Sequence, residues 1–127
     1  MASHTYIAIV DDDSSLCLSL SRLLRLEHFQ PVGYASAEDF LADDRHLRFD
    51  CVVLDIRLGG MSGLELLARL DAEKTALPVI VVTAVDEPAT RARAKALGCV
   101  GFFSKSAPGS GIIAAIRRAT TGAPDPN

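Results

Sequence analysis

Four short apolar runs of the sequence are each followed by a side chain able to bind a cation or a phosphoryl group. In order of the chain, these side chains are Asp11, Asp12, Asp13, Asp55, Thr83 and Lys105. One carboxylate before a helix is explained as a cap, and Asp13 fits that role. Adjacent carboxylates that face Asp55 across a crevice would repel each other unless a cation lay between them. The alternative is an acidic crevice that binds no metal.

The chemistry of these residues favours a phosphoryl-binding site. Oxygen ligands without a neighbouring His or Cys favour a hard divalent ion, and few protein ligands favour Mg²⁺ over Ca²⁺. A magnesium ion beside a lysine and a threonine hydroxyl can neutralise and hydrogen-bond phosphoryl oxygens. Because the sequence has no glycine-rich P-loop, we do not expect a nucleotide.

The elements that would position these residues alternate along the chain. Apolar runs without polar alternation are typical of parallel strands covered on both faces, and apolar spacing of three and four residues indicates the helices between them. The predicted strands are Tyr6–Val10, Val32–Ala35, Cys51–Leu54, Val79–Val82 and Val100–Phe103, and the predicted helices are Ser14–Glu27, Ala37–Ala42, Gly63–Leu70, Pro88–Leu97 and Ile112–Ala119. This alternation predicts an α/β fold with three layers, a flavodoxin-like (βα)5 domain whose five-stranded parallel sheet has the order 2-1-3-4-5. Ligands of such sheets bind at the carboxyl ends of the strands, where the polar residues lie.

Length and composition limit the other possibilities. The 127 residues are 49% hydrophobic and 23% charged, which fits one globular domain over residues 1–121 and excludes a disordered chain. Residues 122–127 are expected to be a disordered tail or the start of a linker. Without an apolar run of membrane length or a signal peptide, we expect a soluble cytoplasmic protein with no membrane contact. The cysteines, Cys17, Cys51 and Cys99, are expected to be buried reduced thiols.

Charge is unevenly distributed. From Pro88 onward the acid is Asp125 alone, against Arg91, Arg93, Lys95, Lys105, Arg117 and Arg118. The basic last third is either a solvated face or a docking patch, and the net charge of -3 argues against direct nucleic-acid binding by this domain.

The motifs together resemble the receiver domain of two-component response regulators over about residues 5–120. They are Val10-Asp11-Asp12-Asp13, Val53-Leu54-Asp55-Ile56-Arg57-Leu58, Met61-Ser62-Gly63, Val82-Thr83-Ala84 and Phe102-Phe103-Ser104-Lys105. The resemblance implies that Asp55 accepts a phosphoryl group from a histidine kinase or phosphotransfer protein. It also implies that Asp12, Asp55 and the Arg57 carbonyl ligate Mg²⁺ directly while Asp11 acts through water. Lys105 and Thr83 would bind phosphoryl oxygens, and Phe102 would turn inward when Thr83 moves.

The sequence departs from that family at two positions. Ser106 replaces the proline that usually follows the lysine in a cis peptide bond, so the bond is either trans in a rearranged loop or cis and strained. Gly59 stands where the family often has proline and is followed by Gly60, which predicts a looser turn. The alanine-rich helix Pro88–Leu97 has little apolar area to hold it in place, which predicts a movable surface.

Three classes of function remain open on the sequence alone. The first is a signalling module, with self-phosphorylation and self-dephosphorylation as its only chemistry, that switches a partner or homodimer surface on the fourth helix, last strand and fifth helix. A magnesium-dependent aspartyl-phosphate phosphatase is the second, although Arg57 stands where such enzymes need an acid. The third is a receiver-like interaction domain that acts without phosphorylation.

Overall fold

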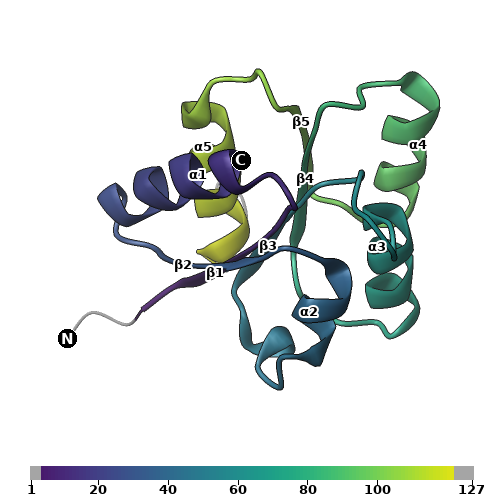
Figure 1. Cartoon of the computed structure of the whole chain (residues 1–127), viewed down its shortest axis with the longest axis horizontal. Helices are drawn as coiled ribbons and strands as arrows, with labels where there is room; N and C mark the ends of the chain where they lie inside the picture. Colours follow the sequence, from purple (N-terminus) through teal and green to yellow (C-terminus); the bar gives the residue numbers. More distant parts are fainter. Residues whose placement is uncertain (1–3, 122–127) are drawn as a thin grey trace.

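The computed structural model describes residues 4–121, so the predicted tail at 122–127 lies outside the described residues. Strands and helices alternate along the chain, with one short 3-10 turn, η1, between α2 and β3 (Figure 1). The strands are β1 (Tyr6–Val10), β2 (Gln30–Tyr34), β3 (Cys51–Leu54), β4 (Val79–Thr83) and β5 (Gly101–Ser104). The helices are α1 (Ser14–Leu26), α2 (Ala37–Ala42), η1 (His46–Arg48), α3 (Gly63–Ala72), α4 (Pro88–Ala96) and α5 (Gly109–Thr120).

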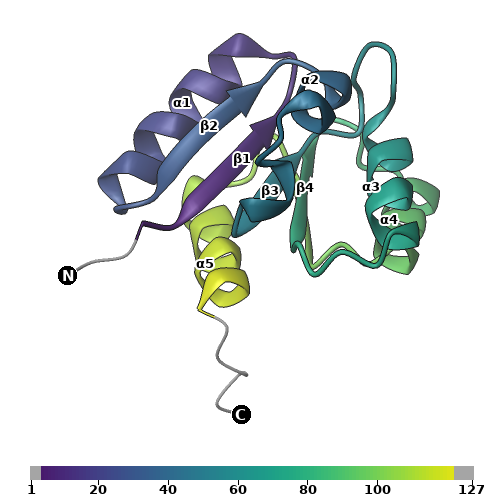
Figure 2. The same ribbon diagram turned by 90° about the horizontal axis from the view of Figure 1, so that it is seen from below.

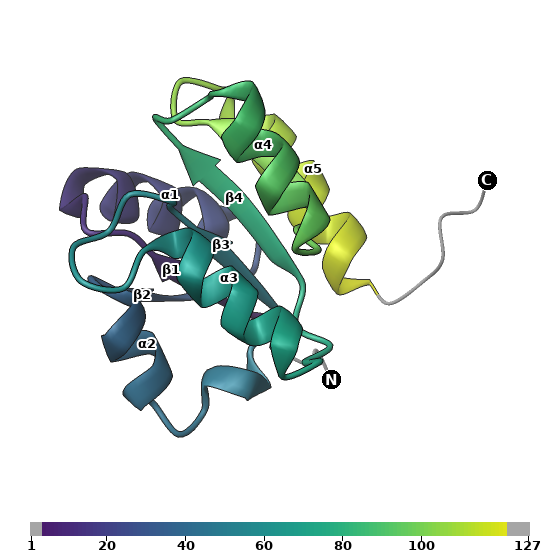
Figure 3. The same ribbon diagram turned by 90° about the vertical axis from the view of Figure 1, so that its right-hand side faces the viewer.

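All strand pairs are parallel, and their order is β2-β1-β3-β4-β5, which confirms the predicted fold and topology. One apolar core joins α2, α3 and α4 to one face of the sheet, and a second joins α1 and α5 to the opposite face. Figures 2 and 3 show the helices on the two sides of the twisted sheet. Because β1, β3 and β4 are covered on both faces, they are apolar throughout apart from Tyr6 and Thr83 at their ends.

The largest errors in the predicted boundaries lie where apolar periodicity was the only guide. Strand β2 begins at Gln30 rather than Val32 and includes Pro31, which an edge strand accepts because one side of its backbone has no partner strand. Helix α5 begins at Gly109 rather than Ile112, because its first turn is Gly-Ser-Gly and has no apolar signal. Helix α3 ends at Ala72 rather than Leu70, and the remaining ends differ from the prediction by one residue or none.

Helices α1, α3 and α4 end in the same way. In each, the residue after the cap is left-handed: His28 (φ 71°), Lys74 (φ 53°) and Gly98 (φ 94°). Its N–H and the next N–H bond back to carbonyls of the last turn, which satisfies acceptors that the helix would otherwise leave free. Glycine adopts this conformation without steric cost at Gly98, whereas His28 and Lys74 adopt it at a cost.

Helix α4 is held by little apolar area, as its composition predicts. Pro88 occupies its first turn, and Ala94 is its only buried residue. The half-buried Leu97, just past the helix, adds a larger contact with the core. Within residues 4–121, no helix is both long and apolar enough to cross a membrane.

The three cysteines are free, but only Cys51 is buried. Cys17 and Cys99 are half-buried, so the expectation of three buried thiols was wrong for these two. Burial raises the pKa of the Cys51 thiol to about 12.

Candidate functional site

The carboxyl ends of the strands bring the predicted site residues to one edge of the sheet. The hydrogen-bond ladder continues past the strands: the Asp11 N–H donates to the Tyr34 carbonyl and the Asp55 N–H to the Val10 carbonyl, both at 3.0 Å. Past the ends of β4 and β5, the Lys105 N–H likewise donates to the Thr83 carbonyl at 3.0 Å. The backbone positions of all three site residues are therefore set by the sheet.

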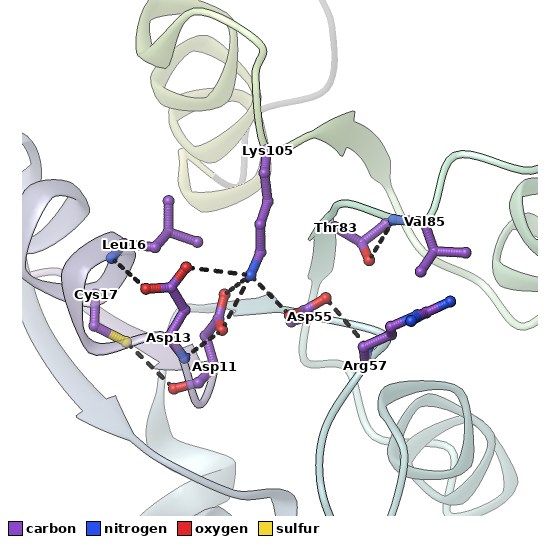
Figure 4. A network of polar contacts seen from close by, with 9 residues as sticks. All are labelled: Asp11, Asp13, Leu16, Cys17, Asp55, Arg57, Thr83, Val85 and Lys105. Carbon is purple, nitrogen blue, oxygen red and sulfur yellow. Dashed lines mark hydrogen bonds and ion pairs between the residues drawn. The ribbon is translucent and has the colours of Figure 1, made fainter.

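Lys105 is the centre of the polar network (Figure 4). Its Nζ lies 3.0 Å from Asp55 Oδ2, 3.3 Å from both carboxylate oxygens of Asp11 and 3.8 Å from Asp13 Oδ2. Burial alone would lower the pKa of the Lys105 ammonium, but its hydrogen bonds and charge interactions with Asp55 and Asp11 outweigh burial and raise the pKa. The lysine thus bridges the two sides of the crevice as a cation.

The carboxylates of Asp11, Asp12 and Asp55 form a compact cluster in which one oxygen of each lies within 4.8 Å of the others. Asp11 and Asp55 are buried, whereas Asp12 is exposed at the mouth. Burial raises the pKa of Asp11, and the charge of Asp55 adds to the rise, while a hydrogen bond from the Asp13 N–H and the charge of Lys105 oppose it. Three hard oxygen donors open to solvent on one side fit a magnesium ion that keeps part of its water shell.

Asp55 is fixed from two directions. Its Oδ1 accepts a hydrogen bond of 3.2 Å from the Arg57 N–H. On its backbone side, the first residue of α3, Gly63, packs against the peptide: a Cβ at this position would overlap the Asp55 carbonyl oxygen and lie 2.7 Å from Ile56 Cα. Only glycine allows α3 to begin this close to Asp55.

Thr83 and Phe102 occupy the neighbouring strand ends. Thr83 is fully buried, and its hydroxyl accepts a hydrogen bond of 3.2 Å from the Val85 N–H rather than contacting Asp55. Phe102 is half-buried beside the core under α4, with the Arg91 guanidinium 4.6 Å from the centre of its ring. Thr83 is therefore buried with its oxygen partnered, and the half-buried Phe102 ring contacts Arg91 of α4.

The loop after Lys105 resolves the alternatives that Ser106 left open. The Lys105–Ser106 peptide bond is trans. The Ser104 hydroxyl accepts a hydrogen bond of 3.2 Å from the Ser106 N–H and lies 2.9 Å from the Ser106 hydroxyl, and the Ala107 N–H donates to the Ser104 carbonyl at 2.9 Å. A serine-based turn thus directs Lys105 into the crevice without a proline.

Sequence reasoning missed three contributions to this site. Asp13 was expected to cap α1, and it does accept the Leu16 N–H at 3.2 Å, but its other oxygen also faces Lys105. The Cys17 thiol donates to the Asp11 carbonyl at 3.5 Å. Glu38 reaches from α2 to the loop after Asp55 and accepts the Met61 N–H at 2.8 Å, a contact for which the sequence carries no local signal.

Comparison with known proteins gives one consistent answer. The family model of the response regulator receiver domain matches residues 7–117. The transcriptional regulatory protein FixJ of Rhizobium meliloti is 36% identical over 120 residues, covering 94% of this chain and 58% of FixJ. FixJ of Bradyrhizobium diazoefficiens is 33% identical over 105 residues, covering 83% of this chain and 51% of that regulator.

Solved structures agree with the sequence relatives. The structure of FixJ-N has a TM-score of 0.82 at 32% identity, covering 98% of this chain and 99% of that one. A CheY-like receiver domain protein from Methanospirillum hungatei has a TM-score of 0.86 at 24% identity, covering 94% and 95% of the two chains, and this likeness shows the fold alone. The chain spans about half the length of the FixJ regulators that it matches. With the family model covering most of its length, this chain belongs to the response regulator receiver domains of two-component signalling systems.

Proposed function

We propose that Asp55 is the phosphoacceptor of this receiver domain and takes a phosphoryl group from the phosphohistidine of a kinase or phosphotransfer protein. The observation that carries the proposal is the meeting of Lys105 Nζ with Asp55 Oδ2 at 3.0 Å beside two further carboxylates. A carboxylate between a lysine and a candidate cation site is a nucleophile placed among the charges that phosphoryl transfer requires.

The transfer step is a substitution at phosphorus. A carboxylate oxygen of Asp55 forms the new P–O bond as the P–N bond to the donor imidazole breaks, and the imidazole leaves with its electron pair. Lys105 then binds a phosphoryl oxygen through the ammonium that contacts Asp55 before transfer. Asp12, Asp55 and the Arg57 carbonyl would hold Mg²⁺ directly and Asp11 through water, and the ion would neutralise phosphoryl oxygens.

The resulting change in shape is assigned to Thr83 and Phe102. When the Thr83 hydroxyl binds a phosphoryl oxygen, it gives up the hydrogen bond from the Val85 N–H, which loosens the start of the loop before α4. Phe102 then turns into the space that the threonine leaves, away from Arg91. The surface of α4, β5 and α5 changes as a result, and we assign partner binding or homodimer formation to this surface.

The domain's chemistry is limited to gaining and losing one phosphoryl group. We therefore expect incubation with acetyl phosphate and Mg²⁺ to give a single phosphoryl adduct by intact mass spectrometry. Asp55→Asn should abolish the adduct, because an amide oxygen is a poor nucleophile. The matched control is Asp44→Asn, which removes an exposed carboxylate from the loop after α2 and should be phosphorylated like the wild type.

Two results would contradict this assignment. An adduct of unchanged yield in Asp55→Asn would place the phosphoryl group on another residue. A wild-type chain that binds Mg²⁺ but forms no adduct, even with a phosphorylated histidine donor, would support an interaction domain that acts without phosphorylation.

A further inference from the structure

The loop between β3 and α3 connects the acceptor to the helix that follows it. It runs from Ile56 to Ser62 and includes Arg57 and the glycines at positions 59 and 60. Its two ends are fixed, since Asp55 continues the sheet and the Gly63 N–H donates to the Ile56 carbonyl at 2.9 Å. Two successive glycines between these ends give the backbone wide freedom unless a tertiary contact restricts it.

Glu38, in the first turn of α2, supplies that contact. Its Oε2 accepts the Met61 N–H at 2.8 Å across 23 residues of sequence. Gly60 has φ 72°, and a Cβ there would overlap the Glu38 carboxylate, so the glycine lets the side chain lie against the loop backbone. The same hydrogen bond lowers the pKa of the Glu38 carboxyl.

Helix α3 does not need Glu38 to begin. Its first turn is closed by its own residues: the Glu65 N–H donates to the Ser62 hydroxyl at 3.1 Å and the Ser62 N–H donates to the Glu65 carboxylate at 3.0 Å. The contact from α2 therefore restrains the loop before the helix, which is the segment that carries Arg57.

We infer that Glu38 is a positioning residue for the phosphoryl site, because it fixes the β3–α3 loop and thereby the backbone of Arg57. This inference rests on the proposed function, in which the Arg57 carbonyl is a magnesium ligand. The Arg57 N–H also donates to Asp55 Oδ1 at 3.2 Å, so one loop position serves both the cation and the acceptor. Glu38 thus takes the place of a loop proline as the restraint on this turn.

The test compares Glu38→Ala and Glu38→Gln with Asp39→Ala, which removes an exposed acid from the same first turn of α2. Mg²⁺ dissociation constants are measured by isothermal titration calorimetry on the unphosphorylated chain, and exchange of the Met61 amide is followed by NMR. We expect Glu38→Ala to raise the Mg²⁺ Kd about 10-fold, the lower end of the range for residues that orient a metal ligand. Met61 exchange should be faster, Glu38→Gln should lie between Glu38→Ala and the wild type, and Asp39→Ala should match the wild type in both.

The outcomes separate this inference from the proposed function. A wild-type chain that does not bind Mg²⁺ contradicts the metal site itself. Wild-type Mg²⁺ affinity in Glu38→Ala, with a faster Met61 amide, overturns the positioning role and leaves only a loop contact. Urea unfolding without Mg²⁺ measures how much Glu38 contributes to the stability of the metal-free fold. If Glu38→Ala lowers the free energy of unfolding by the same amount with and without Mg²⁺, the inference is also overturned. Glu38→Gln keeps an acceptor oxygen and decides the matter if Glu38→Ala does not fold.

Discussion

At the scale of single residues, the site depends on charge balance around one lysine. Lys105 contacts carboxylates from two strand ends and from the residue that caps α1. In the proposed phosphorylated state, its ammonium would bind the phosphoryl oxygens that add negative charge to the crevice. The sequence predicted that these residues converge, but not the contact from Asp13, because the second oxygen of a capping aspartate has no sequence signature.

A second charged network lies away from the site, at the end of α2. Asp43 accepts hydrogen bonds from the Arg45 guanidinium at 2.9 and 3.0 Å and from the Tyr34 hydroxyl at 2.6 Å. The hydrogen bond to Arg45 is the main cause, and that to Tyr34 the second, of a pKa of Asp43 well below its usual range. The Asp43 carboxylate is therefore favoured in the folded state over the unfolded state.

This shift has a definite effect on stability at low pH. A carboxyl group whose pKa is lower when folded stabilises the protein fully above its unfolded pKa of about 4, and this contribution is lost as the pH falls below that value. Asp43→Asn should therefore destabilise the chain more at pH 7 than at pH 3 in urea unfolding. Tyr34→Phe, which keeps the Arg45 pair, should show a smaller difference of the same sign. An Asp43→Asn effect that grows toward low pH would contradict this account.

At the scale of the elements, the ends of helices carry stability that apolar patterns do not reveal. The apolar spacing predicted all five helices, and Gly98 ends α4 with a residue suited to a positive φ. The positions of His28 and Lys74 could not be predicted in the same way, because neither residue favours a left-handed backbone. The loop restraint from Glu38 was missed for a related reason: it joins two elements that are distant in the sequence.

Opposite substitutions at His28 and Gly98 test the cost of the left-handed backbone at helix ends. His28→Gly should stabilise the chain by about 0.5–1 kcal/mol, because glycine adopts a positive φ without steric cost but gives the unfolded chain more freedom. Gly98→Ala should destabilise it by about 1 kcal/mol for the same backbone reason, since its Cβ would meet only Asp71 Oδ1, at an ordinary 3.7 Å. Urea unfolding at pH 7 measures both, and changes of the same sign would contradict the explanation.

At the scale of the whole molecule, three of the six basic residues in the last third form ion pairs at separate places. Lys105 lies in the site, Arg91 pairs with Asp86 at 2.8 Å, and Arg117 pairs with Glu27. The sheet order and both cores followed from the sequence because strand and helix alternate with short connections. The distribution of surface charge did not, since it depends on which acids the fold places beside each base.

The surface of α4 and β5, to which we assign homodimer formation, combines apolar and cationic side chains. A surface cavity of about 230 Å³ lies there, lined by Arg91, Lys95, Cys99, Val100, Gly101 and Phe102. Val100 lines this cavity and is 57% exposed, so a substitution there changes the surface without disturbing the core.

Sedimentation velocity tests the proposed homodimer. Phosphorylated wild type should sediment as a dimer at concentrations where the unmodified chain is a monomer. Val100→Asp should stay monomeric while still forming the Asp55 adduct, because a buried unpaired charge opposes association. Leu47→Asp, at a side chain that is 53% exposed in η1, is the matched control and should dimerise. Dimers of Val100→Asp would exclude this surface.

The placement of Lys105 next to an edge strand has a consequence for how long the site stays assembled. Strand β5 is outermost and pairs with β4 alone, whereas the strands that carry Asp11 and Asp55 are interior. Outer strands fray at a lower free energy than a core opens. Fraying of β5 would move the Lys105 ammonium away and leave the aspartates in place. This transient form would keep its cation ligands but lose the side chain that binds phosphoryl oxygens. The lifetime of the phosphorylated state would then depend on how often the edge strand β5 opens.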